Sequence, residues 1–167
     1  MSISRFWQIR FAIPLALALT VGCGLVVRWR VRCADSEIRG RLLHQATAIA
    51  RTIDPGLARQ LAFAESDRGQ VPFETIRNQL VAYGDFIRNR CVYTMALRDG
   101  RVLFGPESLS PDDPLASSPG TVFRQPDPRL FEVMEHGRSQ VFGPVRDEYG
   151  EFISALAPVV DPASGKV

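Results

Sequence analysis

The side chains that could carry catalysis or hold a metal ion are few and scattered along this chain. The two histidines, His44 and His136, lie far apart, and neither has cysteines or carboxylates beside it at metal-ligand spacing. The sequence also lacks a phosphate-binding glycine loop, a dinucleotide fingerprint and a nucleophile elbow. We therefore predict no catalytic residue, no metal site and no cofactor.

The adjacent acids Asp147 and Glu148 come nearest to a cation site. They stand between two segments rich in β-formers, and Gly150 follows them. Acidic residues in a hairpin connection are usually solvated, and glycine readily supplies the positive φ that such a turn needs. We interpret residues 147–150 as a solvated turn rather than a metal or catalytic site.

Small-molecule binding is the chemistry that the strand pattern favours. Side chains alternate between the two faces of a strand, so Tyr93 and Met95 share one face, as Phe152 and Ser154 do on a later strand. We predict that this larger, part-polar face lines a ligand pocket together with Phe104. Plain core packing is the alternative for Tyr93 and Met95.

Two further segments would enclose this pocket. The stretch at 106–120 is dense in Pro, Ser and Asp, and its length suggests a loop that lies over the pocket. The opposite strand face carries small side chains, which let a helix approach closely, and we expect it to pack on a long N-terminal helix: Thr94, Ala96, Ala155 and Ala157.

The long helix is predicted from a stripe of apolar residues at helical spacing: Ile38, Leu42, Ala46, Ile49 and Ile53. Few polar residues separate this segment from the apolar run before it, so we expect one continuous rod of roughly 50 residues. We expect this stripe either to pack against its own domain or to form a dimer interface, and one helix can do both.

Shorter helices follow the rod. Asp54-Pro55 is typical of a helix start, which predicts a second helix over 56–64. A third helix is predicted to break at Gly84-Asp85, and its apolar face comprises Phe73, Ile76, Leu80 and Tyr83. Asp127-Pro128 predicts another helix that ends at Gly137.

The strands are predicted in two pairs. Asp99-Gly100 is a strong two-residue turn signal between strands at 91–98 and 101–105. Two more strands are predicted at 141–145 and 152–160. The sequence thus indicates an α+β fold in which helices cover one antiparallel sheet.

The run at 11–27 contains no charged residue. As a helix it rises roughly 26 Å, near the lower limit for crossing a hydrocarbon core of about 30 Å. Trp7 and Trp29 are placed to lie at the two headgroup levels. We predict a transmembrane helix and flank at 11–32 after a cytoplasmic N-terminus at 1–10.

Three alternatives compete with this span. A cleaved signal peptide would share the basic start and the short apolar core. Residues 19–23 form a loose lipobox that would place a lipid on Cys23. A buried core helix is disfavoured because nothing in the run could face solvent. Counting positive charges alone slightly favours the opposite orientation.

The remaining composition excludes other classes. Five of the 20 basic residues and none of the 18 acidic residues precede position 34, so the rest of the chain carries a formal net charge of −3 and we predict no nucleic-acid partner. Cys23, Cys33 and Cys91 imply no disulfide framework within the domain, and we expect Cys33 as a free thiol, with a cross-link between protomers as the alternative.

Four stretches, taken in order, resemble one family: ARTIDPGLARQL, VYTMALRDGRVLFGPE, SPGTVF and VFGPVRDEYGEFISALAPVVDPASGKV. With the anchor before them, they are similar to the extracytoplasmic PAS-like (Cache-type) sensor domains that precede histidine kinase or diguanylate cyclase modules in bacterial receptors. The resemblance implies a periplasmic sensor domain at 33–167, held in the inner membrane. It also implies that a final strand, a second span and an output module should follow Val167.

The resemblance further implies what the domain binds. Members of this family bind small metabolites, often carboxylates, and a carboxylate would require an arginine. Arg98, Arg124 and Arg146 are candidates, and we select Arg124 because it directly follows the 106–120 loop. A solvated surface charge is the alternative for each arginine.

We expect a membrane-bound homodimer in which ligand binding shifts the long helix. The chain itself is not predicted to be an enzyme, whereas the resemblance implies a kinase or cyclase in the full-length protein. Two other functions stay open, a lipid-anchored or secreted binding module without signalling output and an enzyme of unrecognised type.

Overall fold

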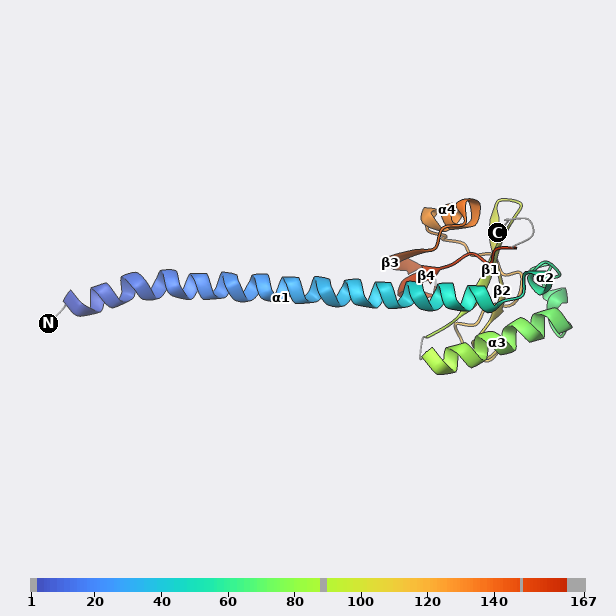
Figure 1. Cartoon of the computed structure of the whole chain (residues 1–167), viewed down its shortest axis with the longest axis horizontal. Coiled ribbons are helices and arrows are strands. Elements are labelled where there is room, and N and C mark those ends of the chain that lie inside the picture. Colours follow the sequence, from blue (N-terminus) through green and yellow to red (C-terminus); the bar gives the residue numbers. More distant parts are fainter. Residues whose placement is uncertain (1–2, 88–89, 148, 162–167) are drawn as a thin grey trace. The chain divides into compact units, whose positions relative to one another are not determined.

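The computed structural model describes residues 3–87, 90–147 and 149–161, with side chains from residue 16 onward. Its elements are α1 (Ile3–Thr52), α2 (Pro55–Ala58), the 3-10 turn η1 (Glu65–Asp67), α3 (Val71–Ile87), β1 (Tyr93–Arg98), β2 (Arg101–Glu107), α4 (Pro128–His136), β3 (Gln140–Asp147) and β4 (Gly150–Leu156) (Figure 1). The predicted α+β class is confirmed, with a long N-terminal helix packed against antiparallel strands. The chain forms two compact units, Met1–Gly40 and Arg41–Val167.

Helix α1 confirms the predicted rod, because all 50 of its residues form one helix. In the Met1–Gly40 unit its described apolar side chains are exposed, among them Leu17, Val21 and Leu25. No helix in the described part of the chain is long and apolar enough to cross a membrane. The predicted span covers residues 11–32, and the side chains of residues 11–15 lie outside the described part of the chain.

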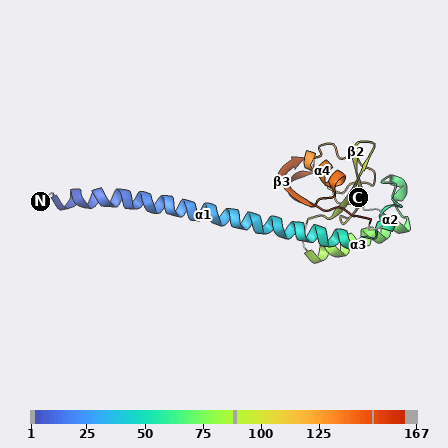
Figure 2. The ribbon, with the colours of Figure 1, turned by 45° about the horizontal axis from the view of Figure 1, so that its top comes forward.

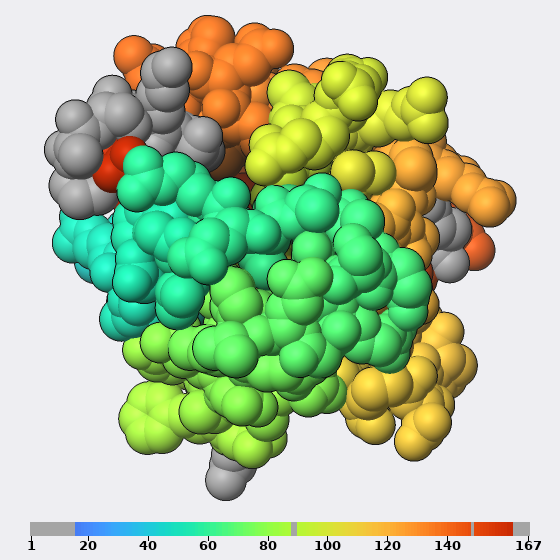
Figure 3. All heavy atoms as spheres, turned by 90° about the vertical axis from the view of Figure 1, so that its right-hand side faces the viewer, coloured from blue at the N-terminus to red at the C-terminus, as the bar shows by residue number. Residues whose placement is uncertain are grey.

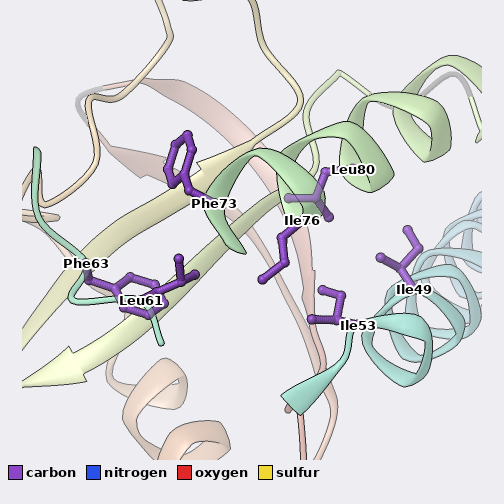
Figure 4. Close-up of a cluster of buried hydrophobic side chains, with 7 residues drawn as sticks. All are labelled: Ile49, Ile53, Leu61, Phe63, Phe73, Ile76 and Leu80. Carbon is purple, nitrogen blue, oxygen red and sulfur yellow. The ribbon is translucent and has the colours of Figure 1, made fainter. Parts of the chain in front are cut away.

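The core of the Arg41–Val167 unit lies where the end of α1 meets α3, and both ribbon views place these helices side by side (Figures 1 and 2). Seven buried apolar side chains converge there: Ile49, Ile53, Leu61, Phe63, Phe73, Ile76 and Leu80 (Figure 4). Full burial of one such side chain stabilises the fold by roughly 1.5–3 kcal/mol. The predicted apolar face of the third helix is therefore confirmed as a core face.

The second helix is shorter than predicted, since it ends at Ala58 rather than at residue 64. The carboxylate of buried Asp67 accepts hydrogen bonds from the N–H groups of Ala62, Phe63 and Ala64 at 3.1, 2.7 and 3.3 Å. These bonds hold a non-helical loop that directs Phe63 into the core. The segment from α2 to η1, drawn in teal to green, covers one end of the unit (Figure 3).

The third helix is longer than predicted, because α3 passes through Gly84-Asp85 and ends at Ile87. A glycine inside a helix costs about 1 kcal/mol relative to alanine. Burial of Ile76 and Leu80 on the same helix offsets that cost. The predicted break is wrong because tertiary packing outweighs local propensity.

Both predicted N-caps are present. Asp54 Oδ1 accepts a hydrogen bond from Gly56 N at 2.7 Å, and Asp127 Oδ1 accepts one from Arg129 N at 2.9 Å. Such caps satisfy backbone donors that the first helical turn leaves unpaired. Helix α4 ends as predicted at Gly137, whose φ of 66° is left-handed.

The first hairpin confirms the Asp99-Gly100 turn. The two turn residues have φ values of 49° and 72°, and Arg98 is paired with Arg101 across the turn. Positive φ at both central positions is the geometry that fits the twist of a two-residue hairpin. The return strand is longer than predicted and ends at Glu107, inside the expected 106–120 loop.

The second hairpin is closed by a two-residue connection, because Asp147 is paired with Gly150. Strand β3 therefore continues past the predicted end at 145, and β4 begins before 152 and ends at Leu156 rather than at 160. Gly150 has a φ of 133°, which confirms the predicted positive value. Glu148, which we assigned to the turn, lies outside the described residues.

The prediction of one antiparallel sheet is wrong for the described strands. They form two separate two-stranded sheets, β1–β2 and β3–β4. The outer edge of β2 pairs instead with the end of the loop, where Phe104 N donates to Thr121 O at 3.0 Å and Phe123 N donates to Val102 O at 2.8 Å. The residues after Asp161 lie outside the described part of the chain, so the final strand that the resemblance implies stays a prediction.

We expect Ile76→Ala to lower the free energy of unfolding by about 2–5 kcal/mol, because this side chain is 1% exposed and its removal leaves a cavity. The check is urea denaturation of the full chain, followed by circular dichroism. The control is Phe86→Ala on the same helix, where the ring is 85% exposed and the expected change is within about 0.5 kcal/mol. Equal losses for the two variants would contradict the placement of the core.

Candidate ligand-binding cavity

A cavity of about 250 Å³ lies within the Arg41–Val167 unit. Its lining comes from α1, from both hairpins and from the loop between β2 and α4. Cavities for drug-sized ligands measure roughly 300–1,000 Å³, so this one suits a small metabolite.

The structure brings four of the five predicted binding residues to this cavity. Tyr93 and Met95 line it from β1, Phe104 from β2 and Ser154 from β4. The fifth, Arg124, is exposed and is not among the lining residues. Arg98 and Arg146, the other arginines considered, are also exposed and outside the lining. That any of these residues binds a ligand stays a prediction.

Strand alternation explains why the four residues meet. Tyr93 and Met95 are two positions apart on β1 and therefore share a face, and Met95 is paired with Phe104 on β2. Ser154 reaches the same space from β4. Burial raises the pKa of the Tyr93 hydroxyl above its ordinary value, and the nearby Ser154 side chain opposes that rise.

The prediction that α1 covers the face with small side chains is wrong in part. Three α1 residues, Leu42, Ala46 and Ile49, line the cavity together with Tyr93 and Met95. On the other face of β1, Ala96 packs against the core cluster at the end of α1 and in α3. The end of α1 therefore reaches both faces, because the two hairpins are separate sheets and do not present one continuous surface.

The 106–120 loop contributes to the cavity as predicted for a covering segment, since Leu115 and Ser117 are lining residues. Ser117 N donates a hydrogen bond to Glu107 Oε1 at 2.7 Å. The Ser117 hydroxyl donates to the Tyr149 hydroxyl at 2.9 Å. One loop residue thus connects the first hairpin to the turn of the second.

Two carboxylates and one guanidinium border the cavity. Glu107 is 8% exposed, and Asp147, which we assigned to a solvated turn, is half-buried. Among the described lining residues the one basic side chain is Arg90, which is exposed and whose guanidinium carbon lies 5.9 Å from the centre of the Phe152 ring. The lining is therefore acidic by formal charge.

Burial raises the pKa of Glu107 above its ordinary value. The hydrogen bond from Ser117 N and the charge of Arg77 oppose this rise, and the charge of Asp113 adds to it. Burial, assisted by Glu107, also raises the pKa of Cys91 to about 11, so this lining thiol stays protonated at neutral pH.

Sequence reasoning missed several lining residues. Glu107 was assigned to a loop, Asp147 and Tyr149 were assigned to a turn, and Phe123 was given no role. The short spacing between Asp147 and Gly150 is the signal that could have found Tyr149. A two-residue connection between strands keeps the Asp147 carboxylate and the Tyr149 ring close to the hairpin. Phe123 carried no comparable signal, since its position depends on the pairing of the loop with β2.

The fold and cavity define an α+β domain that has a long N-terminal helix, small antiparallel sheets and a small-molecule-sized cavity. Among the described residues no group of three or more His, Cys, Asp and Glu side chains could hold a metal ion. The chain matches no protein-family model, no curated protein and no solved structure.

We expect Glu107→Gln to change the pH dependence of stability. The pKa of Glu107 is higher in the folded chain than in the unfolded chain, so the folded chain binds a proton at this carboxylate more tightly than the unfolded chain does. The stability that this group contributes is present below its ordinary pKa of 4.5 and is lost as pH rises through the folded pKa. Urea midpoints should therefore show the variant gaining stability over the native chain at pH 8 but not at pH 4.

The matched control is Glu151→Gln, which removes an exposed carboxylate from β4. It should show a smaller difference between the two pH values than Glu107→Gln does. If Glu107→Gln changed the urea midpoint equally at pH 4 and pH 8, burial of the Glu107 charge would not be what destabilises the fold at high pH.

Proposed function

We propose that this chain is the sensing part of a membrane-anchored receptor and that its cavity binds a small-molecule ligand. The observation that carries the proposal is the composition of the cavity wall, to which α1 contributes Leu42, Ala46 and Ile49 while both hairpins and the loop between β2 and α4 contribute other residues. A ligand there contacts the helix and the strands at once. Its binding can therefore alter how the end of α1 packs against the hairpins.

Helix α1 is the element that would transmit such a change. It extends without a break from Ile3 to Thr52, and Ile49 belongs both to the core cluster and to the cavity lining. A ligand can shift the equilibrium between two packings only through a difference in its affinity for them. Because Ile49 takes part in both environments, a change in the cavity acts directly on helix packing.

The sequence at 11–27 supports the membrane anchor. Its described part, residues 16–27, is apolar, and large side chains such as Leu19, Val21 and Leu25 are exposed rather than gathered on a buried face. Helices that are apolar all round are found within membranes or large cores. We propose a cytoplasmic N-terminus and a periplasmic domain held in the inner membrane.

The proposed type of receptor follows from the resemblance to PAS-like (Cache-type) sensor domains. The order of a long helix, shorter helices, a hairpin, a helix and a second hairpin supports it. By the same resemblance we propose a homodimer, and a histidine kinase or diguanylate cyclase as the output of the full-length protein.

Ligand binding can be tested with the full chain and a panel of small carboxylates, amino acids, amines, sugars and nucleosides. A compound at a hundred times its Kd stabilises a native protein by about 2.7 kcal/mol, which should raise Tm by roughly 5–10 °C. We expect at least one class to do so. A panel without any such shift would overturn the proposal.

Ala46→Leu tests whether the cavity is the binding site. Leucine favours helices and would occupy part of the cavity, so we expect the ligand-induced rise in Tm to disappear. Ala48→Leu is the matched control, because Ala48 lies two residues further along the same helix and is exposed. If both variants respond equally to ligand, binding takes place elsewhere.

The anchor is tested by replacing Leu19 and Val21 with arginine together. Each arginine at the centre of a spanning helix costs about 2.5–3.5 kcal/mol, so the variant should leave the carbonate-washed membrane fraction. The control places arginine at Val31 and Ile38, outside the apolar run. The anchor would be contradicted if the native chain were found in the soluble fraction, or if the variant with arginine at Leu19 and Val21 stayed in the membrane fraction.

A further inference from the structure

We propose that the cavity binds a small organic cation whose ammonium head lies among the rings of Tyr93, Phe104, Phe123 and Tyr149, beside the carboxylates of Glu107 and Asp147. The inference rests on the proposed ligand-binding function and specifies the chemical class of the ligand.

Four aromatic rings in the cavity lining form one cluster with Phe104 at its centre. The centre of the Phe104 ring lies 5.7 Å from that of Tyr93, 5.5 Å from that of Phe123 and 5.6 Å from that of Tyr149. The angles between these ring planes are 71°, 52° and 77°, so none of the three pairs is stacked face to face. A cation within about 6 Å of several such rings is attracted by their electron-rich faces.

Each of the two carboxylates is held in place by a backbone hydrogen bond. Glu107 Oε1 accepts a hydrogen bond from Ser117 N at 2.7 Å, and Asp147 Oδ1 accepts one from Tyr149 N at 2.8 Å. Ser117 also donates to the Tyr149 hydroxyl. These bonds link an acid of each hairpin to the aromatic cluster, which places negative charge and ring surface around the same space.

The lining disfavours the carboxylate ligand that the family resemblance implies. A carboxylate in this cavity would meet two acidic side chains and several ring faces, which all repel negative charge. Arg90 is the one basic side chain among the described lining residues, and its guanidinium already lies over the Phe152 ring. The chain thus places its own cation against an aromatic ring of the lining, and an ammonium ligand would use the same interaction.

The decisive comparison uses two probes of equal shape. Choline carries a trimethylammonium head, and 3,3-dimethylbutan-1-ol replaces the charged nitrogen with carbon. In titration calorimetry with the full chain, we expect choline to bind at least about tenfold more tightly, since cation–π contacts add to the burial of the methyl groups. Equal affinities, or tighter binding of succinate than of choline, would overturn the inference.

Variants of Tyr149 separate the ring from its hydroxyl. Tyr149→Phe keeps the ring and should retain choline binding, whereas Tyr149→Leu should weaken it about tenfold. Glu107→Gln should weaken choline but leave 3,3-dimethylbutan-1-ol unchanged. Phe86→Leu and Glu151→Gln are the controls, because they remove an exposed ring and an exposed carboxylate away from the cavity.

The outcomes distinguish this inference from the proposed function. If another class of compound raises Tm, Ala46→Leu abolishes that rise, and choline does not bind, then the cavity is a ligand site and the cationic assignment is wrong. If no compound binds, both proposals fail. If Tyr149→Leu does not fold by circular dichroism, Phe123→Leu provides the same test from the loop side of the cluster.

Discussion

The fold depends on the last turns of α1, because both hairpins need them as a buried partner. A two-stranded hairpin on its own is at best marginally stable in water. Ala96 and Leu103 of the first hairpin pack on the cluster that contains Ile49 and Ile53. Near the second hairpin, Thr47 Oγ1 donates to Ser139 Oγ at 3.4 Å, and α1 side chains share the cavity lining with β4. The two hairpins are therefore connected through packing against the end of α1, since no hydrogen bonds join their described strands into a single sheet.

This arrangement leaves a cavity of about 250 Å³ between the hairpins. Polar groups of Glu107, Ser117 and Ser154 lie in its wall and allow water to enter. A ligand that displaced this water would have to match both the rings and the carboxylates.

Local signals in the sequence were sufficient for most elements and insufficient for their assembly. The cap at Asp54, the Asp99-Gly100 turn and the stop at Gly137 each depend on a few neighbouring residues, and each was predicted correctly. The early end of α2 depends on Asp67, a buried acid several residues away. The separation into two sheets depends on which edges meet in space, which strand periodicity does not encode. Periodicity identified Tyr93 and Met95 as cavity residues, but Phe123 is there because of loop pairing.

Ile49 shows why a cavity of this kind suits a switch. It lies one helical turn from Ile53 in the core and one turn from Ala46 in the cavity wall, so the same face of α1 packs in the core and lines the cavity. Closely packed interfaces move between discrete arrangements rather than deforming gradually. Moving a population from one in ten to nine in ten requires about an 80-fold difference in ligand affinity between the two states. A few aromatic–cation contacts at about 0.5–2 kcal/mol each, present in one packing and absent in the other, are enough to supply that difference. The proposed receptor therefore requires no large rearrangement, only two packings of α1 that place the rings differently around the ligand.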